Sequence, residues 1–283
     1  MIGSNANELQ SNERIDLIRS LPFFAVNLLG IAGFYYVFQD WQVFVALLIL
    51  YYVRMFFVTG FQHRYFSHRS FQIKGPQWLK RSVQFVMGVC VTSTAQKGPL
   101  WWAVHHRHHH KHSDEPQDIH SRKLKGFWWS HVGWILCPKF HTADYGNIKD
   151  FAKYPELLLL EKWWAYLMAP VALGAACLWY GGFPMLMGGF FTSTFLLYHG
   201  TFCINSVAHM WGTQRFKTGD ESRNNPVLNI LTLGEGWHNN HHHQEAFEAQ
   251  AITRWEKVSD ITHQILWLWS LTGMVKLNLR KPA

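Results

Sequence analysis

Residues 42–68 read QVFVALLILYYVRMFFVTGFQHRYFSH, an apolar stretch that runs directly into two histidines five positions apart. Residues 42–60 are apolar except for Gln42 and Arg54, and their number is what a membrane-spanning helix requires. The neutral imidazole of histidine is a common metal ligand. This stretch therefore predicts a membrane helix that leads to a metal site formed by His63 and His68.

Three further stretches resemble the first in length and composition. Residues 21–38 contain one Asn and no charge, and residues 164–180 and 184–204 are also uncharged. The four stretches form two hairpins with short connectors, 39–41 and 181–183. One such stretch is equally typical of the core of a large soluble protein, but four in two hairpins favour a membrane. We therefore expect an all-α membrane protein with four transmembrane helices.

The basic residues indicate which side of the membrane each loop occupies. Of the 26 Lys and Arg residues, 25 lie in the N-terminal tail, in 61–163 or in 205–283, and only Arg54 lies in a predicted span. Because positively charged loops stay in the cytoplasm, we expect both termini and one cap, 61–163 plus 205–283, to be cytoplasmic. The net charge of +8 is thus explained by a membrane and not by nucleic acid. Residues 78–95 are apolar but contain Lys80 and Arg81, which predicts a helix lying in the membrane interface.

Most of the 18 histidines fall in three clusters on this predicted cytoplasmic side. Two clusters repeat the spacing i, i+3, i+4, which places three imidazoles on one helical face. A single structural metal takes three or four protein ligands, so the whole set suits two metals. The nine candidate ligands are His63, His68, His106, His109, His110, His209, His238, His241 and His242. Metal-bound imidazoles usually donate their other N–H to an acceptor, and the nearby polar candidates that would orient them are Asp114, Asp118, His120 and Glu235.

Other kinds of site are not supported. Soluble carboxylate di-iron bundles carry two Glu-x-x-His motifs, whereas this chain has only Glu235-Gly-Trp-His238. It contains no P-loop, nucleophile elbow or dinucleotide-binding glycine motif, so we expect neither NAD nor flavin to bind. If the metals perform redox chemistry, electrons must come from a separate protein. A zinc-binding or transport protein would instead carry ionisable residues deep in its spans.

Five elements, in order, resemble the membrane fatty-acid desaturases, specifically the Δ9 acyl-CoA desaturase branch. Residues 59–70, TGFQHRYFSHRS, are similar to the first histidine box of that family, and His106–His110 fits H-R-x-H-H. Residues 130–134, SHVGW, residues 205–209, NSVAH, and residues 234–242, GEGWHNNHH, match three further family motifs. The resemblance covers most of the chain, from the second predicted span almost to His243.

The resemblance implies one desaturase domain, 1–283, with two irons in a cytosolic cap. The nine histidines would hold the irons, and Asn205 would contribute through a water molecule. The family's reaction uses O2 and electrons from ferredoxin or cytochrome b5 with a reductase to introduce a cis double bond, at Δ9 in this branch, into a fatty acyl thioester or acyl lipid. A hydroxylase on the same scaffold is the alternative enzyme. The compact chain favours a bacterial inner membrane over the endoplasmic reticulum.

The resemblance also implies a substrate tunnel. Gln96, Trp102 and Thr201 match positions that line its bend, and Tyr51 matches a residue near its closed end. Met55 lies one helical turn after Tyr51, and we expect it to shorten the tunnel and favour C16 over C18 chains. The family's residues for the CoA head are replaced by Val104 and His105, and only Lys139 remains of a basic pair. The acyl carrier, whether CoA, acyl carrier protein or glycerolipid, therefore stays open.

Overall fold

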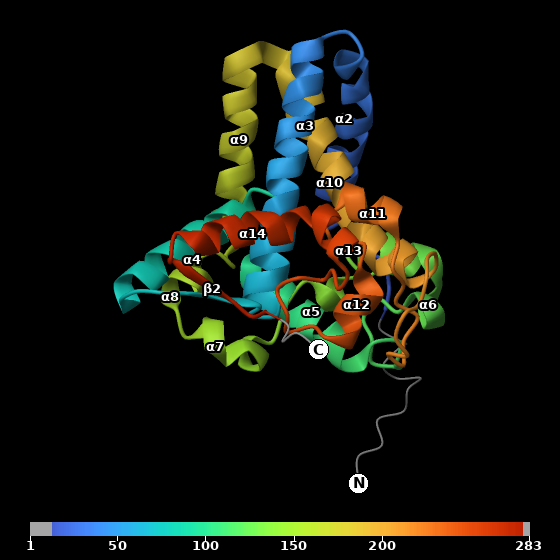
Figure 1. Cartoon of the computed structure of the whole chain (residues 1–283). Coiled ribbons are helices and arrows are strands. Elements are labelled where there is room, and N and C mark those ends of the chain that lie inside the picture. The colour runs from blue at the N-terminus through green and yellow to red at the C-terminus, as the bar shows by residue number, and fades with distance from the viewer. Residues whose placement is uncertain (1–12, 280–283) are drawn as a thin grey trace.

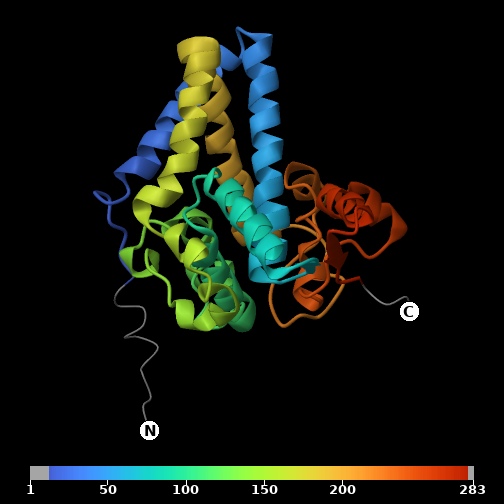
Figure 2. The same cartoon turned by 90° about the vertical axis from the view of Figure 1, so that its left-hand side faces the viewer.

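The computed structural model describes residues 13–279. Four apolar helical arms rise together from a wider cap of shorter helices, and both views show this division (Figures 1 and 2). The arms are α2 (Leu21–Val37), α3 (Trp41–Phe56), α9 (Trp163–Pro184) and α10 (Thr192–Ser206), the last preceded by η5 (Met185–Phe191). All four stretches that the sequence marks as apolar are thus helical. Residues 1–12 and 280–283, the termini that we expect to be cytoplasmic, lie outside the described residues.

Two of these helices continue without a break into the cap. Within the described chain, the helical stretches Trp41–Ser67 and Trp163–His209, of 27 and 47 residues, are long and apolar enough to cross a membrane. Leu21–Val37 is apolar but shorter. The longer stretch reverses at Gly182, whose φ of +65° is a conformation that glycine adopts without strain. The helix itself continues past residue 60, because η1 (Phe57–Ser67) follows α3 directly and carries it into the cap.

Small residues allow the arms to pack closely. A Cβ atom added to Gly33 would collide with the carbonyl of Met187 and the hydroxyl of Thr192, and one added to Gly188 would collide with Val43. The Thr192 hydroxyl donates a 2.8 Å hydrogen bond to the carbonyl of Gly30. Glycine at helix contacts lets backbones approach each other in apolar surroundings, so α2 and η5 are held in direct contact.

Short helices and turns form the cap. They are α4 (Gln77–Thr92), α5 (Pro99–His112), α6 (Arg122–Trp128), η2 (Trp129–Gly133), η3 (Pro138–Phe140), η4 (Tyr145–Ile148), α7 (Lys149–Ala152), α8 (Pro155–Leu159), η6 (Val207–His209), α11 (Pro226–Leu231), α12 (His238–His243), α13 (Arg254–Ser259) and α14 (Ile261–Leu271). Helix α4 corresponds to the interfacial helix predicted at 78–95. The two predicted cap stretches therefore pack into one body, as Figure 1 shows.

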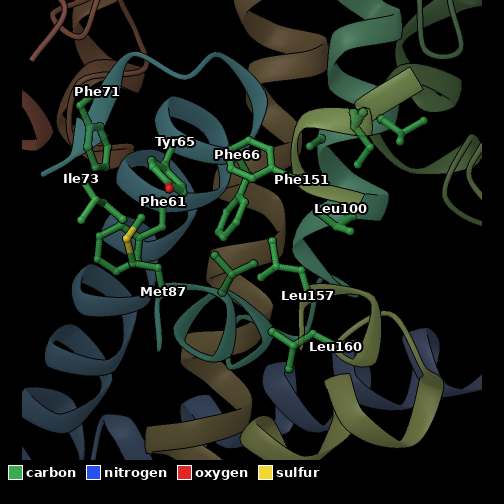
Figure 3. Close-up of a cluster of buried hydrophobic side chains, with 14 of the residues drawn as sticks. Phe61, Tyr65, Phe66, Phe71, Ile73, Met87, Leu100, Phe151, Leu157 and Leu160 are labelled. Atoms are coloured by element: carbon green, nitrogen blue, oxygen red, sulfur yellow. The ribbon is translucent and has the colours of Figure 1, made fainter. Parts of the chain in front are cut away.

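The cap has its own hydrophobic core, which joins elements distant in sequence. Phe61, Tyr65 and Phe66 of η1 pack against Leu100 of α5 and Phe151 of α7 (Figure 3). Strand β1 (Phe71–Ile73) pairs antiparallel with β2 (Val275–Leu277), with Gln72 opposite Lys276. The chain is mostly helical, as expected, and this two-stranded ribbon is the sheet that the described chain contains.

Candidate metal centre

The first histidine pair owes its geometry to a π-helix. Residues Phe57–Ser67 form a π-helix, in which the backbone N–H bonds to the carbonyl five residues earlier. The His68 N–H makes such a bond, 3.2 Å long, to the carbonyl of His63. Two histidines five positions apart lie on different sides of an α-helix, but the wider turn here brings their rings together, with centroids 4.8 Å apart.

Five histidines from three elements form the first group. Their candidate ligand nitrogens all lie within 4.8 Å of one another, and the members are His63, His68, His106, His110 and His241. The Nε2 atoms of His68 and His106 are 2.8 Å apart. The Nε2 atom of His241 lies 3.1 Å from that of His63 and 3.1 Å from that of His110. Helices α5 and α12 thus supply three of the five rings.

The second group combines further rings of α5 and α12 with His209 of η6. His109, His209 and His242 place their ligand nitrogens within 4.8 Å of one another. His238 joins them, because its Nε2 atom is 3.0 Å from that of His209. An overlapping set combines His109 with Asp118 and His120. The nine histidines selected from the sequence therefore gather in one place, divided five and four.

Carboxylates fix the orientation of four of these rings. The Nδ1 atom of His63 lies 2.7 Å from Glu235, that of His109 lies 3.0 Å from Asp118, and that of His110 lies 2.9 Å from Glu245. His242 Nδ1 lies 2.6 Å from Asp220. Because an ionised carboxylate only accepts hydrogen bonds, each Nδ1 carries the proton and donates it. The Nε2 lone pairs are then directed into the two groups.

Burial and charge keep most of these imidazoles neutral. Burial, together with repulsion from neighbouring imidazoles, lowers the pKa of His68, His106, His110, His238 and His241 well below the usual value. The pKa of His242 falls to about 4, mainly through burial. Although burial acts in the opposite direction, His109 holds the pKa of Asp118 below its usual range, and His242 does the same for Asp220. Neutral imidazole is the form that binds metals.

The arrangement fits a pair of divalent metal ions. When two rings both carry their proton on Nδ1, the lone pairs of their closely spaced Nε2 atoms repel each other. A cation bound between the two atoms removes this repulsion. Two imidazole nitrogens about 2.1 Å from one ion, at a right angle, would be about 3.0 Å apart, which is close to the spacing found. The buried Nε2 atom of His242 has no hydrogen-bond partner among the described residues. Imidazole-rich sites suit Zn, Cu, Fe and Ni, so the residues can hold such metals.

Four other histidines of the clusters are engaged elsewhere. His105 bonds to the carbonyl of Trp101, His108 to that of Gln117, and His112 to Glu115. The ring of His243 stacks on Phe216. None of the four belongs to either group in the described chain. Spacing alone could not separate these rings from the ligand candidates.

Of the four residues expected to orient ligands, two contact them directly. Glu235 and Asp118 bind His63 and His109 as described above. Asp114 lies 4.0 Å from His209 Nδ1, beyond hydrogen-bond length, and instead accepts from the Glu221 backbone N–H at 2.8 Å. The ring of His120 packs against that of His109 at 4.2 Å.

Two orienting carboxylates, Asp220 and Glu245, were missed. Asp220 lies in a loop far from any histidine in sequence, and nothing in its surroundings marks it. Glu245 follows His242 by three residues, a distance at which contact with the same site could have been expected. Its side chain is 52% exposed, whereas Asp220 is buried.

A buried ion network holds Glu235 in place. The guanidinium of Arg64 lies 2.8 Å from Asp260, 3.4 Å from Glu235 and 3.4 Å from Glu248. Gln250 Nε2 also donates to the Glu235 carboxylate. Removing one member of a buried charged network leaves the others unpaired, so this cluster fixes the position of the first histidine group relative to the C-terminal part of the cap.

A cavity of about 800 Å³ leads from the histidines into the apolar arms. We call it the long cavity. Trp102 stacks on His106 at its inner end, with ring centroids 4.6 Å apart, and Gln96 Nε2 donates to the Thr201 hydroxyl at 3.1 Å. These three predicted substrate residues, and Asn205, line the long cavity. Its volume is in the range of small-molecule sites.

The remaining predicted substrate residues lie outside its lining. Tyr51 and Met55 pack against Gly200, and the Tyr51 hydroxyl donates to the carbonyl of Leu231 at 2.9 Å. Lys139 lies 3.2 Å from Glu13. Among the residues of the described chain that line the long cavity, none comes from α3.

The apolar helical arms, the paired histidine groups and the adjoining long cavity are compatible with a membrane-associated enzyme that carries a metal centre. Comparison with known proteins gives the family. The sequence profile of the family described as fatty acid desaturase matches residues 39–258. The chain belongs to this family, and it is an oxidoreductase that desaturates acyl chains.

Named relatives extend over most of the chain. The sn-1 stearoyl-lipid 9-desaturase of Anabaena variabilis is 33% identical over 275 residues, 95% of this chain and 96% of that protein. The sn-2 palmitoyl-lipid 9-desaturase of Nostoc sp. is 35% identical over 78% of this chain and 75% of that protein. The acyl-CoA C20 Delta5-desaturase of Anemone leveillei is 36% identical over 86% of this chain and 76% of that protein.

Proposed function

We propose that the chain introduces a cis Δ9 double bond into a saturated fatty acyl chain, using O2 and two irons held by the nine histidines. The observation that carries this proposal is the long cavity, whose inner end meets His106 and Trp102. Relatives named 9-desaturases, which match most of the chain, support the position of the double bond.

Within this proposal, the five-histidine group holds one iron and the four-histidine group holds the other, with Asn205 acting through a water molecule. When bound, the irons supply the oxidising chemistry that an unactivated methylene requires. The protein's own contribution is orientation. Carboxylates fix the imidazoles, and the long cavity restricts which carbon of the chain lies beside them. Such positioning is a large part of enzymatic rate and selectivity.

Chain-length preference is a further part of the proposal. Tyr51 and Met55 fill the space beside Gly200, next to the cavity residue Thr201. We expect this filling to favour C16 over C18 chains, and a Met55→Ala variant to raise the C18 share of the products several-fold. Gas chromatography of products from a mixture of both saturated chains measures this share. A wild-type preference for C18 would contradict the expectation.

The proposed setting is a membrane crossed four times, by residues 21–38, 42–60, 164–180 and 184–204, with the cap and both termini in the cytoplasm. We place it in a bacterial inner membrane as one desaturase domain, 1–283. The sorting of Lys and Arg supports this topology. Exposed apolar side chains on cap helices also support contact with a membrane, and they include Val227, Ile230, Trp255, Val258, Trp267, Leu268 and Leu271.

Electrons would come from a separate donor of the ferredoxin type, or of the cytochrome b5 type with its reductase. The test of the whole proposal is expression in a desaturase-deficient host, followed by mass spectrometry of the fatty acids. We expect products that have lost two hydrogens, with the double bond at carbon nine. A gain of one oxygen would identify a hydroxylase instead.

A further inference from the structure

Helix α14 of the cap is apolar on its buried face and on its exposed face. It covers Ile261–Leu271 and contains no Asp, Glu, Lys or Arg. Leu266 is buried, whereas Leu268 and Leu271 are 58% and 64% exposed. At about 1.5 Å per residue, its 11 residues extend about 16 Å, which is too short to cross a bilayer. The exposed apolar side chains of the helix are Ile261, Ile265, Trp267, Leu268 and Leu271.

This helix lies where the apolar arms meet the cap. It runs across the side of the cap from which the arms rise, close to the lower part of α3 (Figures 1 and 2). Its Trp269 ring lies 6.2 Å from the ring of Phe61 in η1, the direct continuation of α3. The exposed Trp267 suits this position, because indole side chains favour the membrane interface. The apolar surface of the arms therefore continues onto α14.

The start of α14 is bound to the buried ion network that supports the first histidine group. Asp260 caps the helix by accepting from the His263 N–H at 3.0 Å, and the same carboxylate oxygen accepts from Arg64 Nη2 at 2.8 Å. Arg64 also lies 3.4 Å from Glu235, which is 2.7 Å from Nδ1 of His63. The helix is thus linked to a candidate metal ligand through two buried side chains.

Three further contacts strengthen this link. The hydroxyl groups of Thr262 in α14 and Thr59 in η1 form a hydrogen bond of 2.7 Å, and the Thr262 N–H donates to the carbonyl of Leu233 at 2.9 Å. The Nδ1 atom of His263 lies 2.6 Å from Glu248, another member of the ion network. Because separating buried charged partners is costly, a displacement of α14 also displaces the network that orients the first histidine group.

The second histidine group is supported differently. Its carboxylates are held by their own loops, since Asp118 accepts from the Asp114 N–H at 2.9 Å and Asp220 accepts from the Ser222 N–H at 3.0 Å. Within residues 13–279, neither carboxylate bonds to α14. A change at α14 should therefore reach the first group and spare the second.

We propose that α14 is a membrane-contact helix whose docking on the bilayer fixes the first histidine group, so that lipid contact raises the metal affinity of that group. The partner is the lipid bilayer that surrounds the arms, and burial of the exposed apolar side chains holds the helix against it. This inference rests on the proposed function, which supplies the metals and the membrane. It adds a physical link between the two.

The first test identifies what covers α14. The photo-reactive amino acid benzoylphenylalanine replaces Leu268 in the full chain, which is placed in nanodiscs of phosphatidylethanolamine and phosphatidylglycerol and irradiated. We expect mass spectrometry to find this residue joined to phospholipid. The control carries the same amino acid in place of Lys149, an exposed residue of α7 at the end of the cap away from the arms (Figure 1). Capture of a second copy of the chain at position 268, or equal lipid capture at both positions, would overturn the inference.

The second test measures metal binding in the same nanodiscs. Zinc(II) is added to metal-free protein in competition with a chelator, and the binding step that His63→Ala abolishes reports the first group. We expect Leu268→Glu to weaken this step about tenfold and to leave the other step unchanged, because a charged side chain draws α14 away from the apolar layer. Ile230→Glu is the matched control, since Ile230 is an exposed apolar residue of α11, and no side chain of α11 bonds to the ion network in the described chain. Equal weakening by both variants, or no effect of Leu268→Glu, would overturn the inference.

These measurements separate the inference from the proposed function, because neither zinc binding nor lipid capture requires desaturation. If the protein desaturates acyl chains but Leu268→Glu binds zinc as tightly as wild type, only the inference fails. If it desaturates nothing but lipid contact still controls the first zinc step, only the proposed function fails.

The third test asks whether the first turn of α14 transmits the effect. Thr262→Val removes the hydroxyl group that bonds to Thr59 and keeps the shape of the side chain. We expect it to weaken the first zinc step several-fold without changing lipid capture at position 268. In the double variant with Leu268→Glu, the two losses should be less than additive, whereas independent sites give additive losses. Additive losses would contradict transmission through this turn.

Discussion

The two ends of helix α5 place carboxylates in opposite situations. At the N-terminal end, Glu161 accepts from two backbone N–H groups, and burial raises its pKa to about 7. At the C-terminal end, Asp118 is fully buried, but contact with the imidazole of His109 holds its pKa below the usual range. Burial favours the neutral form of both carboxylates. The hydrogen-bond donors around Glu161 do not offset it, whereas the imidazole of His109 does so for Asp118. The helix therefore has one titratable end and one permanently charged end.

This difference separates two kinds of function. At the C-terminal end the charge of Asp118 orients an imidazole of the candidate metal centre, whereas Trp101 and Trp102 at the N-terminal end line the long cavity. If this comparison holds, substitution of a candidate metal ligand at the charged end will reduce activity most. Substitution of a carboxylate that only orients such a ligand will reduce it less. A substitution at the titratable end will instead change pH dependence.

His109→Ala is expected to have the largest effect. It removes a ring from the second histidine group, so desaturation should be abolished while the protein still inserts into the membrane. Metal analysis should show loss of metal from the purified variant. The matched control is His108→Ala, because His108 is adjacent but bonds to the carbonyl of Gln117. Desaturation retained by His109→Ala would contradict the assignment of this residue as a ligand.

The sequence predicted which histidines gather but not how they divide. The spacing i, i+3, i+4 correctly placed His106, His109 and His110 on one helical face. It could not show that His109 turns to the second group while its neighbours join the first. That division depends on where α12 and η1 lie against α5, and long-range packing of this kind leaves no local pattern. The same is true of Asp220, which reaches His242 from a distant loop.

Asp118→Asn tests whether the charge itself matters. The amide oxygen of asparagine can still accept a hydrogen bond from the His109 Nδ1–H, but it lacks the negative charge that stabilises the imidazole in position. Loss of such a partner typically reduces metal affinity or activity about 10- to 100-fold, and we expect a loss in this range. Metal affinity measured by competition with a chelator is the readout, and Asp144→Asn, a residue that caps a turn elsewhere, is the control. An affinity equal to wild type would show that shape alone orients His109.

Secondary structure was predictable where composition was extreme. The four apolar stretches are helical, even though α9 contains Pro170. The continuation of the helix to Ser67 was not predicted, because the apolar pattern gives way to polar residues from Gln62 onward. Burial of Gln62, His63 and Arg64 within the cap explains why a polar sequence remains helical there. The π-helix that aligns His63 with His68 has no recognised sequence pattern.

Glu245→Gln is expected to have a smaller effect than Asp118→Asn. Both carboxylates contact a ligand candidate, but the Glu245 side chain is 52% exposed and Asp118 is buried. Exposed ion pairs contribute little because water screens them, so activity should fall by only a few-fold. Steady-state desaturation rates of the two variants, measured side by side, test the order. A larger loss for Glu245→Gln would show that exposure does not determine the importance of these carboxylates.

Glu161→Gln should leave the metal end intact and alter only the response of stability to pH. The folded-state pKa of Glu161, about 7, lies above the ordinary value of 4.5, so the folded protein retains a proton that the unfolded chain has released. Stability from this group is therefore present below pH 4.5 and is lost as the pH rises through 7. The difference is at most about 3 kcal/mol. Thermal unfolding in detergent should show wild type losing stability over this range relative to the variant, whose amide does not titrate. A parallel pH dependence of the two proteins would mean that Glu161 is ionised throughout, as Asp118 is, and the two ends of α5 would then be alike.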